Sequence, residues 1–157
     1  MNVVAYDPAK KPHVNIEMKT SVSEVLKEAD IISLHCPANK HTKGMVNSEF
    51  LGQVKKGAYL INTSRGALVK DEDLLAHLEA DKTFRYSTDV WNGEPSGKSG
   101  KFTNKLVEHE RVMGSHHIGA STKQSEASIG EEVTRIVNCV RSNGDIDVFN
   151  WANKNGF

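Results

Sequence analysis

Short apolar runs alternate with amphipathic stretches along most of this 157-residue chain. Runs of strand length lie at residues 2–6, 14–17, 30–36, 58–62, 84–90 and 111–114. Helical patterns lie between or after them, at 21–29, 47–54, 71–80 and 121–141. This alternation, with nearly continuous apolar strands, is typical of a parallel sheet that helices cover on both faces. We therefore predict an α/β fold built on a doubly wound, Rossmann-like parallel sheet.

Two of the predicted helices carry signals at their first turn. Ser21 is followed three residues later by Glu24, which is the spacing of a capping box. Asp71, Glu72 and Asp73 place negative charge at the start of another helix, where the helix dipole favours it. These signals predict helix starts near residues 21 and 71.

Composition excludes several classes of function. The chain has 20 Lys and Arg and 20 Asp and Glu, so it lacks the basic stripe of a nucleic-acid binder. No apolar run approaches the length of about 20 residues that spans a membrane, and the first residues do not have the layout of a secretion signal. Cys36 and Cys139 have no zinc-binding spacing, so we expect free thiols, no metal site and a cytoplasmic location.

Polar residues lie at or just beyond the ends of five of the predicted strands. They are Asp7, His35, the segment 63–65, Asp89 and His117. Ligands of parallel sheets bind where the strands end. One polar residue at such a place is ordinary turn chemistry, but five together favour a binding site along that edge.

Three side chains near this edge carry groups that suit catalysis. Arg65 presents a planar fork that can hold a carboxylate with two bonds, although a surface ion pair with the acidic helix start is an equal alternative. Glu94 precedes Pro95 and is by itself typical of a turn, and a single histidine such as His117 is more often structural. As a pair, Glu94 and His117 suit general acid–base catalysis. A carboxylate that bonds one imidazole nitrogen fixes the tautomer and stabilises the imidazolium.

Three motifs in order give the chain a family resemblance. They are NTSRG at 62–66, an aspartate at 89 followed by Glu94-Pro95, and HIGAST at 117–122. With these motifs, residues 1–150 resemble the NAD-dependent, D-isomer-specific 2-hydroxyacid dehydrogenases. The family usually has proline where this chain has His116, so two adjacent histidines compete for one role. The register with Ile118-Gly119 favours His117.

The resemblance implies roles for the candidate catalytic residues. Arg65 would bind the carboxylate and carbonyl of a small 2-hydroxy acid substrate. His117 would donate a proton to the carbonyl in reduction and remove it from the hydroxyl in oxidation. Glu94 would orient His117 and support its charged form. Hydride would pass directly between the substrate and NAD, so the protein contributes positioning and proton transfer.

The resemblance also implies a set of NAD-binding residues. Asp7 would bind the adenosine ribose and favour NAD over NADP, and Asp89 would accept a hydrogen bond from the nicotinamide carboxamide. The remaining cofactor-binding positions would be His35, Cys36, Pro37, Thr63, Ser64, Arg65, His117, Ile118, Gly119 and Ala120.

One element of the family's cofactor site has no counterpart in the sequence. There is no GxGxxG, the glycine-rich turn that follows the first strand of the nucleotide-binding fold. We therefore expect residues 1–142 to be a partial NAD-binding domain that begins at the second strand, with 143–157 as a C-terminal tail. Such a piece would be inactive alone and would bind NAD weakly.

Within the family, the chain most resembles the phosphoglycerate dehydrogenase branch. Its pointers are IGEEV at 129–133, the long loop between Glu94 and His117, and the tail at 143–150. This implies oxidation of 3-phosphoglycerate to 3-phosphohydroxypyruvate in serine biosynthesis, and a homodimer. The alternatives are a glycerate dehydrogenase or hydroxypyruvate reductase, or a non-enzymatic, nucleotide-sensing corepressor on the same scaffold.

Overall fold

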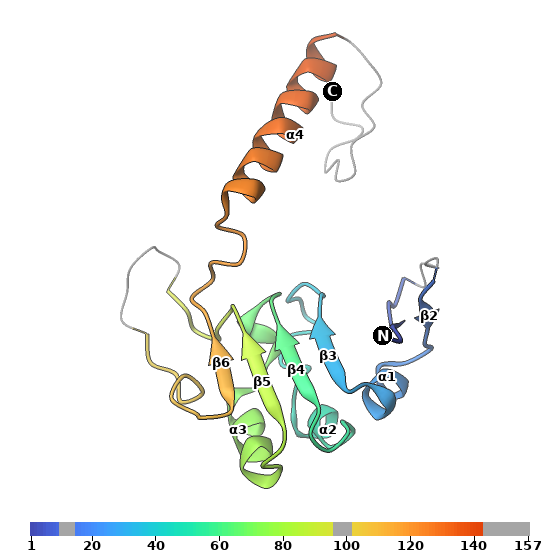
Figure 1. Ribbon diagram of the computed structural model, residues 1–157, viewed down its shortest axis with the longest axis vertical. Coiled ribbons are helices and arrows are strands. Elements are labelled where there is room, and N and C mark those ends of the chain that lie inside the picture. Colours follow the sequence, from blue (N-terminus) through green and yellow to red (C-terminus); the bar gives the residue numbers. More distant parts are fainter. Residues whose placement is uncertain (10–14, 96–101, 143–157) are drawn as a thin grey trace. The chain divides into compact units, whose positions relative to one another are not determined.

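A four-stranded parallel sheet is the centre of the structure, a computed structural model that describes residues 1–9, 15–95 and 102–142. Its strands are β3 (Ile31–Leu34), β4 (Tyr59–Asn62), β5 (Arg85–Thr88) and β6 (Val112–Gly114), in the order β3-β4-β5-β6 (Figure 1). The register aligns Leu34 with Asn62, Asn62 with Thr88, and Thr88 with Gly114. The predicted α/β class with a parallel sheet is confirmed.

One face of the sheet is buried by three helices. These are α1 (Val22–Glu28), α2 (Ser48–Leu51) and α3 (Asp71–Ala80). Alternate strand residues point to this face because side chains along a strand alternate between the two faces. The core unites side chains of the strands with those of the helices, including Leu26, Ile32, Leu34, Phe50, Leu51, Leu60, Leu74, Leu78, Phe84 and Tyr86.

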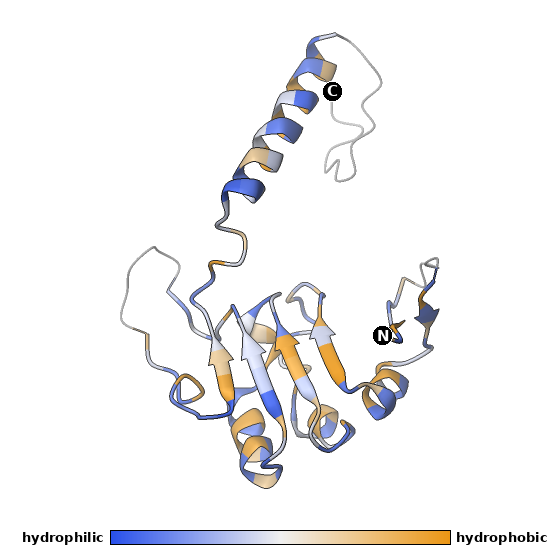
Figure 2. Cartoon of the chain, viewed as in Figure 1, coloured by the Kyte–Doolittle hydropathy of each residue, from blue (hydrophilic) through white to orange (hydrophobic). Residues whose placement is uncertain are grey.

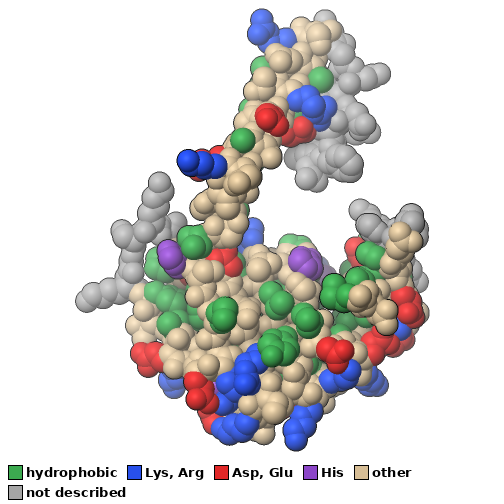
Figure 3. All heavy atoms as spheres, in the orientation of Figure 1, with side chains coloured by type: hydrophobic (Ala, Val, Ile, Leu, Met, Phe, Trp, Pro, Cys, Tyr) green, Lys and Arg blue, Asp and Glu red, His purple; other side chains and the backbone are tan. Residues whose placement is uncertain are grey.

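The opposite face of the sheet is not covered by any helix of the described part of residues 1–117. Ile31 and Tyr59, which are paired neighbours on β3 and β4, and Met113 on β6 are all exposed. Hydrophobic side chains are visible over the sheet in Figure 3. We expected helices on both faces, and this part of the expectation does not hold for these residues. A run such as 30–36 has the same apolar composition whether one or both of its faces are covered.

A second, smaller sheet lies near the N-terminus. It consists of β1 (Val4–Ala5) and β2 (Glu17–Met18), which pair in parallel. The first strand is shorter than the predicted 2–6. The second lies at the end of the predicted run 14–17, whose first residue is outside the described residues.

The predicted helix starts are found, with one difference in detail. Ser21 caps α1, and its hydroxyl accepts a hydrogen bond from the backbone N–H of Glu24. The carboxylate of Glu24 does not complete the box at Ser21 but bonds the backbone N–H and the hydroxyl of Thr20. These bonds lower the pKa of Glu24. Helix α3 has the predicted bounds and carries its acidic residues in the first turn.

Residues 118–157 form a separate unit, of which 118–142 are described. It contains the long helix α4 (Lys123–Arg141), which begins two residues after the predicted start and is capped by the hydroxyl of Thr122. Its apolar side chains at Ile129, Val133, Val137 and Val140 are exposed. Figure 2 shows hydrophobic and hydrophilic residues mixed along this helix. No described helix is long and apolar enough to cross a membrane.

Candidate active site

The parallel strands bring four of the five predicted polar positions to one edge of the four-stranded sheet, whereas Asp7 follows β1 of the separate two-stranded sheet. His35 follows β3, residues 63–65 follow β4, Asp89 follows β5, and Ser115 begins the segment after β6. Hydrogen bonds extend the ladder one step beyond the strands, from the Asp89 N–H to the Asn62 carbonyl and from the Ser115 N–H to the Thr88 carbonyl. The loops after β4, β5 and β6 therefore leave the sheet side by side.

Glu94 and His117, which are 23 residues apart, meet at this edge. The Nδ1 atom of His117 lies 2.8 Å from Oε1 of Glu94, so the carboxylate can hold the tautomer in which Nδ1 carries the proton. The His117 side chain is 51% exposed, whereas that of Glu94 is 29% exposed. The imidazole is thus accessible to a ligand, and the less exposed carboxylate supports it. Such an imidazole can exchange a proton with a ligand.

His117 has an unusual backbone conformation. Its φ of 59° lies in the left-handed region, which residues with a side chain seldom adopt. Its neighbour His116 is exposed and, within the described residues, has no hydrogen bond to Glu94. The structure therefore distinguishes the two adjacent histidines, and the one chosen from the sequence register is the partner of Glu94.

Trp91 connects the two segments that carry this pair. Its backbone N–H donates to Oε2 of Glu94 at 3.0 Å. Its indole Nε1 donates to the carbonyl of Ser115 at 2.7 Å, two residues before His117. The ring also lies beside that of Phe102, with 5.9 Å between centroids. Trp91 had no predicted role, because an aromatic residue after a strand carries no specific signal.

Two glycines allow this tryptophan to pack closely. A Cβ atom built on Gly114 would lie 2.0 Å from the ring atom Cζ2 of Trp91. A Cβ atom built on Gly66 would lie 2.1 Å from the carbonyl carbon of Trp91 and 2.4 Å from the nitrogen of Asn92. Real Cβ atoms do not approach other atoms so closely, so both positions require glycine for this arrangement.

Arg65 lies on the segment held by Asn62. The fully buried Asn62 side chain donates to the carbonyl of Arg65 at 2.9 Å and accepts from the N–H of Ser64 at 3.1 Å. Arg65 is exposed, and its guanidinium donates to the Ser64 carbonyl at 2.6 Å. In the described part of the chain it pairs neither with the acidic start of α3 nor with Glu94 or His117. The segment around Arg65 meets the Glu94 loop through Gly66.

The other predicted cofactor residues differ in whether their polar groups make hydrogen bonds within the chain. The hydroxyl of Ser64 donates to the Leu34 carbonyl at 2.9 Å and ties the ends of β3 and β4 together. Asp89 is buried and accepts from the Ser115 hydroxyl at 2.5 Å. His35 is exposed and bonds Ser33 at 2.9 Å, and Thr63 is exposed.

The remaining predicted residues lie after β3, after β1 or in the second unit. Cys36 is half-buried with its sulfur 3.6 Å from that of Met45, and burial raises the pKa of its thiol. The carbonyl of Pro37 accepts from Thr42, and a carboxylate oxygen of Asp7, after β1, accepts from the N–H of Ala9. Residues 118–120 belong to the second unit and are exposed.

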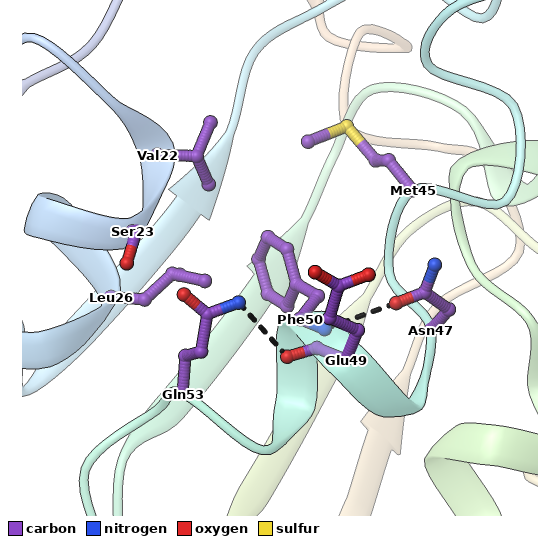
Figure 4. A pocket seen from close by; sticks show the side chains of 8 residues that line it. All are labelled: Val22, Ser23, Leu26, Met45, Asn47, Glu49, Phe50 and Gln53. Carbon is purple, nitrogen blue, oxygen red and sulfur yellow. Dashed lines mark hydrogen bonds between the residues drawn. The ribbon is translucent and has the colours of Figure 1, made fainter.

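Two hollows in the surface are lined by none of the predicted site residues. One, of about 490 Å³, separates α1 from the segment 45–53 and is lined by Leu26, Met45 and Phe50 among others (Figure 4). The second, of about 480 Å³, lies at the start of α3, and Asn92 is among its lining residues. Near it, burial raises the pKa of Asp71, which accepts a hydrogen bond from Asn104. Among the described residues, no group of His, Cys, Asp or Glu could hold a metal ion.

Comparison with known proteins identifies relatives over nearly the whole chain. Residues 1–119 match the model of the family described as D-isomer specific 2-hydroxyacid dehydrogenase, NAD binding domain. D-3-phosphoglycerate dehydrogenase of Bacillus subtilis is 38% identical over 143 residues, which are 87% of this chain and 26% of that protein. Hydroxypyruvate reductase of Thermotoga maritima is 32% identical over 134 residues, or 85% of this chain and 43% of that protein. The chain thus spans less than half the length of these relatives.

Solved structures give the same picture of the fold. An NAD-complexed D-isomer specific 2-hydroxyacid dehydrogenase from Lactobacillus delbrueckii ssp. bulgaricus has a TM-score of 0.81 at 28% identity. It covers 93% of this chain, which corresponds to 47% of that protein. D-lactate dehydrogenase from Aquifex aeolicus, complexed with NAD and lactic acid, has a TM-score of 0.73 at 30% identity and covers 91% of this chain and 47% of that one.

Proposed function

Because this chain belongs to the D-isomer specific 2-hydroxyacid dehydrogenases, in their NAD-binding domain, we propose that it carries the proton-transfer half of such an active site. The reaction is the NAD-dependent oxidation of a D-2-hydroxy acid to the 2-oxo acid, and its reverse. The observation that carries the proposal is the pair of Glu94 and His117, with 2.8 Å between the carboxylate and the imidazole. The pair lies at the strand ends, where ligands of parallel sheets bind.

His117 is the general base for oxidation in this proposal. With Nδ1 bonded to Glu94, the other ring nitrogen, Nε2, accepts the proton of the substrate hydroxyl. The imidazolium that results is stabilised by the adjacent carboxylate. In the reverse direction the same nitrogen returns the proton to the carbonyl oxygen.

Arg65 is the residue that we propose for substrate binding. Its guanidinium is exposed, and its planar fork matches the two oxygens of a carboxylate. The buried Asn62 side chain donates a hydrogen bond to the backbone carbonyl of Arg65. The position of the Arg65 backbone, from which the guanidinium extends, is therefore fixed. A 2-hydroxy acid held there by its carboxylate would present its hydroxyl carbon to the neighbouring groups.

The residues at the strand ends fit a dinucleotide in the chemistry of their groups. Asp89 is a buried carboxylate that follows β5 and bonds the Ser115 hydroxyl, and a carboxylate can also accept from a carboxamide N–H. His35 and Thr63 expose polar side chains at the same edge, and Asp7 follows β1. We propose that these residues hold NAD, together with the backbone at 36–37 and 64. When bound, NAD supplies the acceptor for the hydride.

For the substrate we propose 3-phosphoglycerate, with glycerate or hydroxypyruvate as the second candidate. The support is the 38% identity to a D-3-phosphoglycerate dehydrogenase and the 36% identity to that of Escherichia coli. The hydroxypyruvate reductase at 32% identity supports the second candidate. Values of kcat/KM for D-3-phosphoglycerate, D-glycerate and D-lactate decide between them. A place in serine biosynthesis, a cytoplasmic location and a homodimer belong to the first candidate.

The assay for the catalytic assignment follows NADH formation by the protein that contains residues 1–157. We expect His117→Ala to lower kcat by at least about 100-fold, because general acid–base catalysis contributes about 10²–10⁴-fold. Arg65→Ala should raise KM for the hydroxy acid and lower kcat/KM. Glu94→Gln should lower kcat less than His117→Ala does, because the histidine remains.

His116→Ala is the matched control, since it removes an exposed histidine next to the proposed base. It should leave kcat and KM close to those of the wild type. If His116→Ala abolished turnover while His117→Ala did not, the assignment of the base would be wrong. If Arg65→Ala and His117→Ala both retained full activity, the proposed active site would be refuted.

A further inference from the structure

We propose that Trp91 is a positioning residue that aligns the Glu94–His117 pair and joins it to the segment of Arg65. This inference rests on the proposed function, because it explains how the three candidate groups are held in one arrangement. Trp91 lies on the loop after β5, between Asp89 and Glu94. It contacts each of the three loops that carry these groups.

The first contact fixes the carboxylate. The backbone N–H of Trp91 donates to Oε2 of Glu94 at 3.0 Å, while Oε1 faces Nδ1 of His117 at 2.8 Å. Both oxygens of Glu94 are therefore engaged, one by the backbone and one by the imidazole. A carboxylate held at both oxygens has a defined orientation, and the orientation passes to the ring that it bonds.

The second contact fixes the segment that leads to the histidine. The indole N–H of Trp91 donates to the Ser115 carbonyl at 2.7 Å, and the ring lies against Gly114. Ser115 is 24 positions further along the chain, and its hydroxyl also donates to Asp89. The two loops are thus joined twice before Glu94 and His117 meet.

The third contact reaches the substrate-binding segment. The carbonyl carbon and oxygen of Trp91 are so close to Gly66 that a Cβ atom there would lie 2.1 and 2.2 Å from them. Gly66 is the residue after Arg65 and begins a short 3-10 helix. Loss of the indole bond would therefore let the loop after β6 shift relative to the other two loops.

The experiment removes the indole N–H and keeps an aromatic ring, with Trp91→Phe. The readout that does not depend on activity is the ¹⁵N NMR spectrum of the His117 ring, assigned by comparison with His117→Ala. In the wild type, neutral His117 should carry its proton on Nδ1. In Trp91→Phe the Nδ1–H tautomer should lose its predominance, because the bond to Glu94 is populated for less of the time.

The second readout is turnover. Misplacement by about 1 Å can cost about 100-fold, so a partial loosening should lower kcat by about tenfold while KM for the hydroxy acid changes less than about twofold. Tyr59→Phe is the control, since it alters an exposed aromatic residue on the open face of the sheet. It should change neither readout.

The tautomer decides the outcome. An unchanged ratio of the two neutral forms in Trp91→Phe overturns the inference, whatever happens to kcat. If Trp91→Phe does not fold, replacing Trp91 by benzothienylalanine, which exchanges the N–H for sulfur in a ring of the same shape, gives the same test. Failure of the proposed function is a separate result, because it shows as full activity in Arg65→Ala and His117→Ala.

Discussion

Substitution of Gly66 by alanine tests the packing on which the candidate site depends. A Cβ atom at this position would lie 2.1 Å and 2.2 Å from the carbonyl carbon and oxygen of Trp91, and 2.4 Å from the nitrogen of Asn92. All three are backbone atoms, so no side-chain rotation relieves the overlap. Gly66 is buried and does not have a left-handed φ, so alanine is compatible with its backbone conformation. The loss of stability therefore measures the overlap alone.

The magnitude follows from the distance that the backbone must move. Ordinary contact begins at 3.4 Å, so the Trp91 loop must retreat by about 1.3 Å or more. Overpacking of this kind costs about 1–3 kcal/mol. We expect the upper end of that range, because the loop is held by the Ser115 and Glu94 bonds. With a urea m value of about 1–3 kcal/mol/M, a loss of about 3 kcal/mol lowers the unfolding midpoint by about 1–3 M.

Urea denaturation followed by circular dichroism measures this shift. Gly130→Ala is the matched control, because a Cβ atom there meets nothing within 4 Å. It lies within α4 and should raise helix content, since alanine is favoured over glycine by about 1 kcal/mol in a helix. A Gly66→Ala midpoint equal to that of the wild type would refute the close packing between this loop and Trp91.

Three further predictions concern stability. Burial lowers the pKa of His77 below its ordinary 6.5, and its buried Nε2 has no hydrogen-bond partner among the described residues. The folded state then binds fewer protons than the unfolded state below pH 6.5, so the free energy of unfolding should fall as the pH is lowered through 6.5. The fall should be smaller in His77→Leu, as measured by urea titrations at several pH values. Lys70 is the N-cap of α3 but makes no side-chain cap bond. Lys70→Ser should therefore stabilise the protein by about 1 kcal/mol. Thermal denaturation measures this, and an unchanged melting temperature would contradict it. Asn62→Ala removes the side chain that bonds Ser64 and Arg65 and should cost about 2 kcal/mol in the same assay, whereas a cost near zero would mean that these bonds are not needed.

The sequence predicted the elements with the strongest local signals most accurately. Helix α3 begins at Asp71 and ends at Ala80 as expected, because its acidic first turn marks the start. The strands were predicted too long, since apolar residues such as Val90 continue beyond the last paired residue of a strand. Local composition does not report where a neighbouring strand stops pairing.

The candidate site was predicted only in part, because local sequence patterns do not report contacts between distant residues. Glu94 and His117 were paired because each follows one of two strands that were expected to be neighbours, which is a matter of topology. Trp91 was missed, and Gly66 was noted only as part of the motif at 62–66. Their contact joins residues 25 positions apart, which no local pattern records. The open face of the sheet was also missed, since the pattern of Ile31 and Tyr59 does not reveal what covers them.

The left-handed backbone conformation at His117 lowers the stability of the folded protein. A side chain in that conformation costs about 1–2 kcal/mol compared with glycine, which adopts it freely. Glycine at position 117 would remove this cost, but it would also remove the imidazole of the proposed base. Consensus or stability-guided redesign of this chain should accordingly leave position 117 unchanged.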